Sequence, residues 1–289
     1  MTYDVVIVGG GPAGLSAALA LGRARKRVLL CDAGPRRNAA AVHIHNFVTR
    51  DGTPPEEFRR IGRAQLATYP NVEVRDTGVT AIGGARGAFE VSLDASTVTA
   101  RRLLLCTGMI DEMVPLAGFR ELWGHAIVQC PYCHGWEARD QRWGYLVLPF
   151  NTSHVAMFAQ QLRGWTHDLT VFTQGHVDAE PLRAAGLRVD TAPVTRLERG
   201  SVVTANGTVP IDLLFAHPNQ RHVPVVAALG LELEDGMVKV EPMRKETSVP
   251  GIFAAGDLTS RAQGALFAAA AGAQAATVIN LELTIEQPL

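Results

Sequence analysis

Two cysteines separated by two residues, Cys130 and Cys133, are the side chains of this sequence best suited to redox chemistry. Such a pair can close a small-ring disulfide, and a helix N-terminus or an adjacent histidine can lower a thiol pKa so that thiolate is available near neutral pH. A histidine, His134, follows the pair directly. We therefore predict a redox-active disulfide here, with a purely structural role for His134 as the alternative.

A zinc half-site is the competing interpretation of the cysteine pair. Tetrahedral zinc needs two more ligands, and neither Cys31 nor Cys106 belongs to a second C-x-x-C motif, while the other histidines are dispersed. These two cysteines end apolar runs, where buried thiols behave as small hydrophobic groups. Four cysteines are also too few for a disulfide scaffold in a chain of 289 residues. We expect no metal site.

A glycine-rich turn follows the first apolar run, and it fits G-x-G-x-x-G between a predicted strand and a predicted helix. Gly9 permits the tight turn, Gly11 lets the backbone approach a pyrophosphate, and Gly14 lets helix pack on strand. The helix N-terminus favours the phosphates, and Asp32 lies where an acid accepts ribose hydroxyls. The alternative is a turn that serves only local geometry, and FAD and NAD both remain open. The expected cofactor-binding residues are Gly9, Gly11, Pro12, Ala13, Gly14 and Asp32.

A second turn near the C-terminus favours FAD. Ala255-Gly256-Asp257 follows a predicted buried strand and resembles the motif by which two-dinucleotide flavoproteins hold the flavin ribityl and pyrophosphate groups. The resemblance implies that Asp257 binds the ribityl-phosphate region and that backbone after it faces the isoalloxazine. A simple helix cap at Asp257 is the alternative. The residues expected to bind the cofactor here are Gly256, Asp257, Gln263, Gly264 and Ala265.

Strand-helix-strand patterns occur twice and predict an α/β fold with two Rossmann-like domains, the second inserted in the first. The predicted elements are 3–8, 15–25 and 27–31 in the first pattern, and 145–148, 152–163 and 169–172 in the second. Other runs predict a helix at 54–68, an antiparallel crossover sheet at 72–74, 79–82, 89–93 and 98–106, strands at 213–215 and 251–257, and a helix at 265–281. The predicted domains are an FAD-binding domain, 1–113 and 217–289, and an NADPH-binding-like domain with the redox pair, 114–216.

The glycine turn, the cysteine pair and Gly256-Asp257 together resemble the thioredoxin reductase family of FAD-dependent disulfide oxidoreductases over nearly the whole chain. The resemblance implies that Cys133 faces the flavin and forms the charge-transfer thiolate, while Cys130 exchanges with the substrate. It also implies that His134 takes over the acid-base role of the acid that usually follows the pair. A homodimer is implied as well.

The resemblance implies NADPH as electron donor, but the second strand-helix turn departs from what that donor needs. Residues 148–153 read Leu-Pro-Phe-Asn-Thr-Ser and contain no glycine. Leu148 and Phe150 carry side chains where a pyrophosphate must approach backbone, and Pro149 removes an N–H. Residues 173–176, Thr-Gln-Gly-His, replace the expected arginines. NADPH use is therefore doubtful, with a divergent loop that binds NADPH by other contacts as the alternative.

A flavin and a dithiol without a clear nicotinamide site indicate electron flow from thiols to flavin. The Cys-x-x-Cys-His-Gly-Trp segment resembles the gliotoxin and holomycin dithiol oxidases, a branch of the same family. The leading hypothesis is oxidation of a small-molecule dithiol by Cys130 and Cys133, with FAD and oxygen. A reductase of thioredoxin-like proteins fed by NADPH or another donor is one alternative. A non-catalytic flavin redox sensor is another.

Charge and composition exclude some classes of partner. The net charge is −1 and the 27 basic residues are scattered, so no nucleic-acid partner is expected. The alanine-rich stretch after residue 264 is interpreted as a core helix too short to span a membrane, and the N-terminus has no signal-peptide pattern. We expect a cytoplasmic protein. His43, His45 and Asn46 lie in a loop expected near the flavin, and Asn46 is predicted to bind it, although loop polarity explains them equally well.

Overall fold

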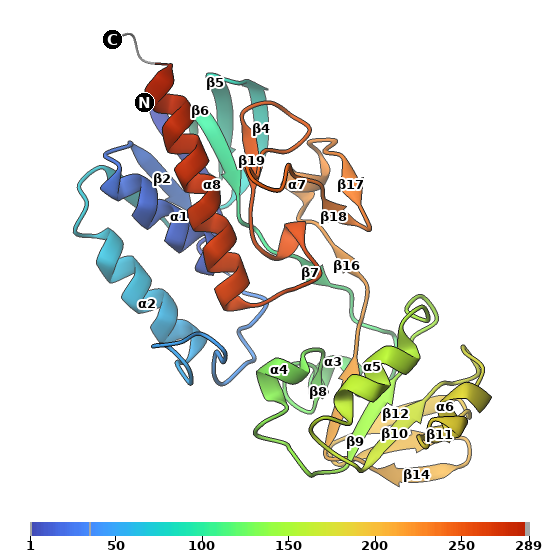
Figure 1. Cartoon of the computed structure of the whole chain (residues 1–289). Coiled ribbons are helices and arrows are strands. Elements are labelled where there is room, and N and C mark those ends of the chain that lie inside the picture. Colours follow the sequence, from blue (N-terminus) through green and yellow to red (C-terminus); the bar gives the residue numbers. More distant parts are fainter. Residues whose placement is uncertain (1, 35, 287–289) are drawn as a thin grey trace. The chain divides into compact units, whose positions relative to one another are not determined.

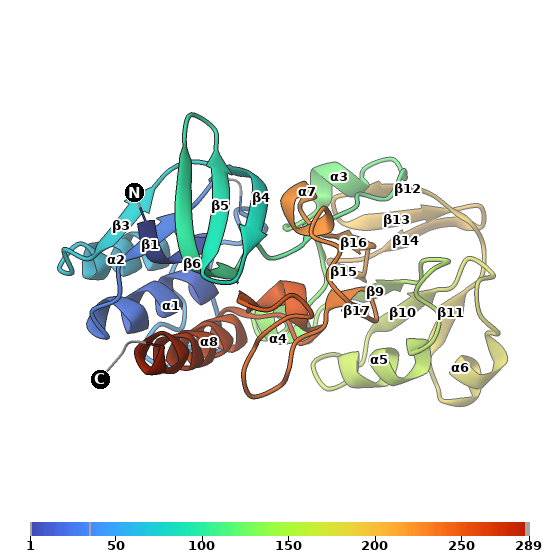
Figure 2. The ribbon, with the colours of Figure 1, turned by 90° about the horizontal axis from the view of Figure 1, so that it is seen from above.

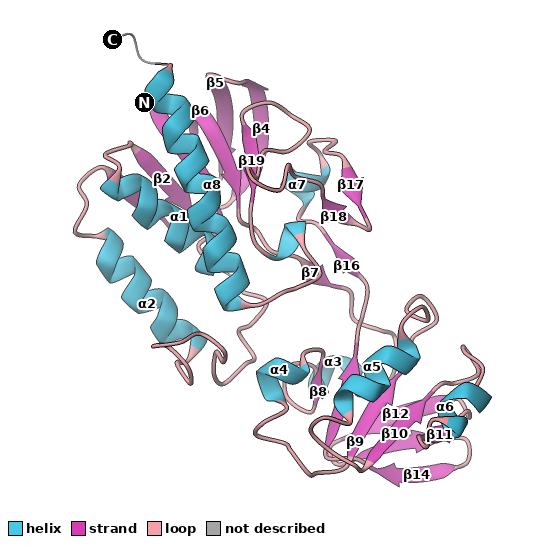
Figure 3. Cartoon of the chain, viewed as in Figure 1, coloured by secondary structure: helices cyan, strands magenta, loops and turns pink. Residues whose placement is uncertain are grey.

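The computed structural model describes residues 2–34 and 36–286, which form two compact units (Figure 1). The first unit comprises Met1–Ala39, Phe47–Ile110 and Arg221–Leu289, and the second comprises Ala40–Asn46 and Asp111–Gln220. The short strands β7 (Ile110–Asp111) and β16 (Gln220–Arg221), where the chain passes between the units, pair with each other. Both units contain helices and strands (Figure 3).

A seven-stranded sheet forms the centre of the first unit, in the order β3-β2-β1-β6-β5-β4, with β19 also paired to β6. β4, β5 and β6 pair antiparallel, which confirms the predicted crossover sheet for these three strands. The prediction was wrong for 72–74, because β3 pairs in parallel with β2 at the far edge of the sheet, and the other pairings are parallel too. The register sets Val8 beside Cys31 and Leu105, and Leu105 beside Ala254, so β1, β2, β6 and β19 end at one edge. The strands are β1 (Thr2–Val8), β2 (Val28–Cys31), β3 (Val72–Arg75), β4 (Val79–Ala85), β5 (Ala88–Leu93), β6 (Thr97–Leu105) and β19 (Ile252–Ala254).

Two helices of the first unit, α1 (Pro12–Arg23) and α8 (Ala265–Ile285), lie side by side (Figures 1 and 2). Gly272 permits their close approach, because a Cβ there would lie 2.1 Å from the Ala13 carbonyl oxygen. With 21 residues and a mean hydropathy of 1.3 in its most apolar window, α8 is longer than predicted and could cross a membrane by length and composition alone. Its inner face is instead part of the core that α1 shares. The remaining elements of this unit are α2 (Pro55–Leu66), α7 (Pro224–Ala227), β17 (Leu233–Glu234), β18 (Met237–Val238) and the 3-10 turn η1 (Asp257–Thr259).

The second unit contains a parallel five-stranded sheet in the order β11-β10-β9-β15-β8 and an antiparallel ribbon β12-β13-β14. β9 lies two residues earlier than predicted, because Trp143 pairs with Leu169 and Leu213 at the start of the sheet. The strands are β8 (Ile127–Val128), β9 (Trp143–Leu146), β10 (Leu169–Phe172), β11 (Arg188–Asp190), β12 (Val194–Glu198), β13 (Ser201–Thr204), β14 (Gly207–Pro210) and β15 (Leu213–Ala216). The helices are α3 (Phe119–Leu122), α4 (Pro131–His134), α5 (Val155–Leu162) and α6 (Glu180–Ala184).

Candidate active site

The turn between β1 and α1 is shaped by three glycines with different constraints. Gly9 has φ +110°, and a Cβ there would meet the Cys106 carbonyl oxygen at 2.3 Å. A Cβ on Gly14 would lie 1.9 Å from the Gly9 oxygen, so helix and strand can approach only with glycine at that position. A Cβ on Gly11, by contrast, would meet no atom within 4 Å. Open space therefore lies beside the residue expected to face the pyrophosphate.

The N-terminus of α1 offers donors to an anionic ligand. Gly11 is its N-cap and makes no side-chain capping hydrogen bond, Pro12 begins the helix, and no acidic residue lies in the first turn. The first N–H groups of a helix have no intrahelical acceptor, and they carry partial positive charge. Together with the open space at Gly11, this helix end fits a dinucleotide pyrophosphate.

Asp32 directly follows β2 and is 8% exposed. Gly10 makes room for it, because a Cβ there would lie 2.4 Å from Asp32 Oδ2. Arg59 of α2 donates from Nε to that oxygen at 2.9 Å and also from Nη2, and Arg63 lies 3.5 Å away. The two arginines thus hold the carboxylate group in place, and neither of them was predicted from the sequence.

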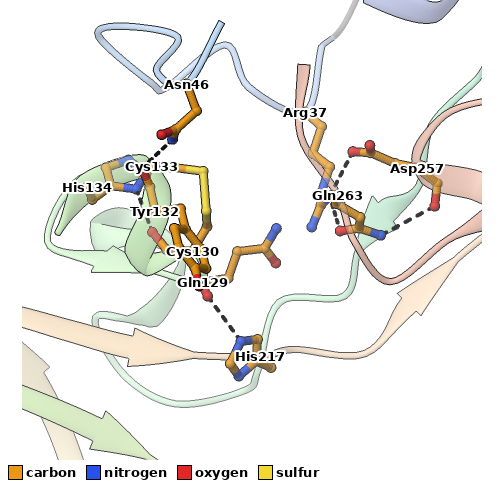
Figure 4. Close-up of a disulfide and its surroundings, with 10 residues drawn as sticks. All are labelled: Arg37, Asn46, Gln129, Cys130, Tyr132, Cys133, His134, His217, Asp257 and Gln263. Carbon is orange, nitrogen blue, oxygen red and sulfur yellow. Dashed lines mark hydrogen bonds and ion pairs between the residues drawn. A yellow bond between two sulfur atoms is a disulfide. The ribbon is translucent and has the colours of Figure 1, made fainter. Parts of the chain in front are cut away.

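The C-terminal turn brings Asp257 and Gln263 together with Arg37, which is far from both in the sequence (Figure 4). Gly256 turns the chain after β19 with φ +90° and caps η1, so Asp257 is not its N-cap. Arg37 donates from Nη1 to Asp257 Oδ2 at 3.2 Å and to Gln263 Oε1 at 2.5 Å, and the Gln263 amide donates to the Asp257 carbonyl at 3.3 Å. Gly264 caps the helix α8, which begins at Ala265. Arg37 is a site residue that sequence reasoning missed, and its only signal was the doubled arginine after Asp32.

The redox segment lies in the second unit and is a disulfide. Cys130 and Cys133 are bonded, with their Cα atoms 5.3 Å apart. Cys130 is the N-cap of the short helix α4, and Pro131 begins it, so the first sulfur sits at a helix start and the second one turn later. The predicted disulfide is therefore confirmed. Among residues 2–34 and 36–286, no group of three or more His, Cys, Asp or Glu side chains could hold a metal ion.

His134 ends α4 and lies beside this disulfide (Figure 4). Its Nδ1 lies 3.4 Å from the Cys130 carbonyl oxygen. Because a carbonyl can only accept, Nδ1 carries the proton in that contact and Nε2 is the basic nitrogen of the neutral ring. Burial lowers the pKa of His134, while the contact with Cys130 and the charge of Glu137 oppose this effect. The ring is thus largely neutral at pH 7 and able to accept a proton.

Residues 40–46 belong to the second unit although the sequence on both sides belongs to the first. Asn46, with φ +62°, donates from its side-chain amide to the Tyr132 carbonyl at 2.6 Å (Figure 4). His45 Nε2 lies 3.6 Å from Glu137 Oε1. Asn46 was predicted to bind the cofactor, and the structure places its side chain on the redox helix. Sequence alone could not reveal this packing, because the two segments are more than eighty residues apart.

The turn after β9 in the second unit is filled by apolar side chains. Val147 and Leu148 are 0% and 2% exposed. The helix that follows, α5, begins only at Val155, with His154 as its N-cap. After β10, the position is occupied by the buried Thr173, whereas an NADPH phosphate would need an exposed arginine or lysine there. These features leave no glycine cradle of the kind seen at residues 9–14.

The remaining two cysteines are buried, as expected from their positions at the ends of strands. Burial raises the pKa of Cys31 to about 12 and raises that of Cys106 further. Neither forms thiolate near neutral pH, so the redox chemistry of the described thiols is confined to the bonded pair.

Comparison with known proteins agrees with this arrangement. Residues 3–156 match the family "Pyridine nucleotide-disulphide oxidoreductase". "Thioredoxin reductase sirT" of Leptosphaeria maculans is 31% identical over 307 residues, which cover 97% of this chain and 94% of that protein. The chain belongs to this oxidoreductase family, as a thioredoxin reductase-like member.

Solved structures support the same assignment to the thioredoxin reductase-like oxidoreductases. The oxidoreductase from Agrobacterium tumefaciens is 37% identical with a TM-score of 0.93, and 99% of this chain and 100% of that one are covered. The putative thioredoxin reductase TrxB from Bacillus anthracis is 32% identical with a TM-score of 0.91, with 98% and 99% covered. Thioredoxin reductase-like enzymes are flavin oxidoreductases that act on sulfur groups, and this chain is an enzyme of that class. The family uses FAD, typically with NADPH.

Proposed function

We propose that this oxidoreductase converts a small-molecule dithiol to a disulfide through Cys130 and Cys133, with FAD as cofactor and oxygen as final acceptor. The observation that supports this direction is the difference between the two nucleotide turns. The turn at residues 9–14 has open space for a pyrophosphate, whereas the turn after β9 has no glycine and buries Leu148. In this proposal the described residues after β9 do not form an NADPH site of the family's usual kind, so electrons enter from the dithiol.

The chain's own residues would carry the thiol chemistry. A substrate thiol gives its proton to His134, and the resulting thiolate attacks the Cys130 sulfur, so the bond to Cys133 breaks and Cys133 leaves as thiolate. The second substrate thiol, deprotonated in turn, attacks the mixed disulfide and releases Cys130. One electron pair has then moved from two substrate sulfurs to the two cysteine sulfurs. When bound, FAD supplies the acceptor for that pair and passes it to oxygen, so R(SH)2 and O2 give RS2 and H2O2.

The proposal also assigns the cofactor-binding residues, the two domains, the cellular compartment and the oligomeric state. Asp257 and Gln263, held by Arg37, are assigned to the flavin side, and Asp32 to the ribose. We assign residues 1–113 and 217–289 to the FAD-binding domain and 114–216 to an inserted NADPH-binding-like domain. The protein acts in the cytoplasm as a homodimer, without a nucleic-acid or membrane partner.

The direct test is anaerobic reduction of the purified, FAD-loaded enzyme, followed by flavin absorbance. Dithiothreitol is expected to bleach the flavin, and NADPH at ordinary concentrations is expected to leave it oxidised. The Cys133→Ser variant should retain FAD and resist dithiothreitol, while Cys31→Ser serves as the matched control and should behave as wild type. Rapid bleaching by NADPH would contradict the oxidase assignment.

A reductase of thioredoxin-like proteins is the second candidate, favoured by the names of the relatives and by the exposed disulfide flank. Tyr132, between the two cysteines, is 61% exposed. This candidate requires an electron donor other than thiols, so bleaching by NADPH in the experiment above supports it. A redox sensor without turnover would consume no oxygen with any dithiol.

A further inference from the structure

We propose that His217 is a positioning residue for the redox disulfide, and that its bond to the backbone beside Cys130 sets the reduction potential of the pair formed by Cys130 and Cys133. His217 directly follows β15 in the second unit. The inference deepens the proposed function and rests on it in one respect, that electrons pass through this disulfide. The ring is assigned no contact with the substrate and no proton transfer.

His217 is bonded to the residue that precedes the first cysteine (Figure 4). Its Nε2 lies 3.0 Å from the Gln129 carbonyl oxygen. Because a carbonyl can only accept, Nε2 carries the proton and donates it to this bond. The accepting oxygen belongs to the peptide group that links Gln129 to Cys130. The bond therefore acts directly on the backbone of Cys130.

The same bond continues the attachment of the redox segment to the parallel sheet. β8 pairs with β15, and Val128 at the end of β8 lies beside Phe215. The next carbonyl along the chain, that of Gln129, is bonded by the side chain of His217. Cys130 thus directly follows a residue that the sheet holds in place, and the position of the first sulfur is tied to the rigid part of the unit.

Aromatic contacts fix the orientation of the His217 ring. Its centroid lies 4.6 Å from that of Phe158 on α5 and 6.2 Å from that of Tyr145 on β9, with interplanar angles of 76° and 79°. Edge-to-face contacts of this kind are favourable, and Tyr145 is 3% exposed. The donor nitrogen is therefore carried by a ring that packs against two elements of the fold, and it is not a mobile surface group.

The peptide groups on both sides of Cys130 are each contacted by a histidine. His217 donates to the carbonyl before Cys130, and His134 Nδ1 lies 3.4 Å from the carbonyl of Cys130 itself. Asn46 in turn donates to the Tyr132 carbonyl between the two cysteines. Because His134 is assigned to the substrate proton and His217 binds from the end of β15, the two rings have separate tasks.

This bond favours the oxidised form of the pair. A disulfide needs both sulfurs together and two thiols do not, so a fixed Cys130 backbone raises the effective concentration of one thiol at the other. Loss of one ordinary hydrogen bond is expected to change the ratio of oxidised to reduced protein about fivefold, which equals about 20 mV for a two-electron couple. The potential matters because the pair has to accept electrons from the dithiol and pass them to flavin.

The test measures the reduction potential of this pair in the FAD-loaded enzyme. The protein is equilibrated anaerobically in mixtures of reduced and oxidised dithiothreitol, its thiols are trapped with N-ethylmaleimide, and the products are counted by mass spectrometry. His217→Phe keeps an aromatic ring and removes the donor, and its potential is expected to be about 20 mV less negative than that of wild type. His217→Gln keeps an N–H donor and should restore the wild-type ratio.

His222 provides the matched control, because its Nε2 also lies 3.0 Å from a carbonyl oxygen, that of Gly236 in the first unit. His222→Phe removes a bond of the same kind in the unit that does not carry the disulfide, and it should leave the potential unchanged. A wild-type potential in His217→Phe, or an equal change in His217→Gln, would overturn the inference.

A second measurement needs no variant and decides the matter if His217→Phe does not fold. NMR of the protein labelled with 15N-histidine should show the Nε2–H tautomer of His217 in the oxidised wild type, and the Nδ1–H tautomer would contradict the bond. Neither measurement depends on the direction of electron flow. If NADPH bleaches the wild-type flavin, the proposed oxidase fails, whereas the displaced potential of His217→Phe still supports the role of His217.

Discussion

At the scale of single residues, the glycine turn shows how one motif combines two different demands. Gly14 is required by the fold, since its missing Cβ lets α1 approach the Gly9 carbonyl. Gly11 has no such neighbour, so the space beside it is available to a ligand. The same residue type thus serves packing at one position and cofactor access at another.

Alanine substitutions should separate these two roles. Gly14→Ala is expected to lower the free energy of unfolding by about 3 kcal/mol, because the added methyl group clashes with backbone. Gly11→Ala should leave the apo-protein's unfolding midpoint unchanged and weaken FAD binding about tenfold or more. Urea denaturation and fluorescence titration with FAD measure the two quantities. If Gly11→Ala bound FAD as tightly as wild type, the space beside Gly11 would not be the pyrophosphate site.

The four cysteines should differ sharply in reactivity once the disulfide is reduced. Since burial raises the pKa of Cys31 to about 12 and that of Cys106 still further, both remain protonated at neutral pH and form thiolate only on strong alkalisation. Iodoacetamide at pH 7.5 is expected to label Cys130 and Cys133 at least about a hundredfold faster than the other two. Mass spectrometry of the labelled peptides checks this. Comparable labelling of Cys31 in the folded protein would contradict the burial argument.

Which site residues could be predicted from sequence depends on how local their signal is. Gly9, Gly11 and the cysteine pair were predictable because their spacing within a few residues fixes backbone and sulfur geometry. Arg37 could not be assigned, because its partner Asp257 is 220 positions away. Asn46 was predicted near the cofactor, yet its side-chain contact is with the redox helix, which only tertiary packing determines.

At the scale of elements, the last helix is held by charge as well as by apolar packing. Arg102 of β6 is fully buried and donates from Nε to Glu282 of α8 at 3.1 Å. Glu282 is 5% exposed and is also bonded by Arg86 and Arg244. The pattern of α8, apolar on nearly all sides, did not indicate that its one internal carboxylate is tied to the sheet.

Removal of one partner should therefore cost more than a surface substitution. Arg102→Met is expected to lower the free energy of unfolding by about 3 kcal/mol, because buried Glu282 loses a partner. Its neighbour Arg101, 27% exposed and paired with Asp4, is the matched control, and Arg101→Met should cost less than about 1 kcal/mol. Urea denaturation measures the free energy of unfolding of both variants. Equal decreases would show that the buried Arg102 pair stabilises the protein no more than the surface pair.

Most elements were predictable because their periodicity is strong, and the boundaries that shifted have physical causes. β9 begins at Trp143 rather than at residue 145, because its partners on β10 and β15 begin there. Helix α8 extends to Ile285, beyond the predicted end, because Glu282 and Leu283 still face the core. The first and last residues of such elements are determined by packing against neighbouring elements, so local sequence does not predict them.

At the scale of the whole molecule, the account depends on two redox centres working in one chain. The first unit provides the glycine turn with Asp32 and Asp257, and the second provides the disulfide with His134. We proposed that Cys133 and the flavin exchange electrons. If they do, the enzyme can hold four electrons, because the disulfide and the flavin each take up two. A protein that bound flavin without exchanging electrons with the disulfide would take up only the two electrons of the flavin.

An anaerobic dithionite titration of the FAD-loaded enzyme, followed by its absorbance spectrum, tests this claim most directly. Wild type is expected to take up about four electrons per chain before the spectrum stops changing, with a long-wavelength charge-transfer band at the half-way point, whereas the Cys130→Ser, Cys133→Ser double variant takes up about two. Uptake of only two electrons by wild type, or a purified chain that cannot retain flavin, would contradict it.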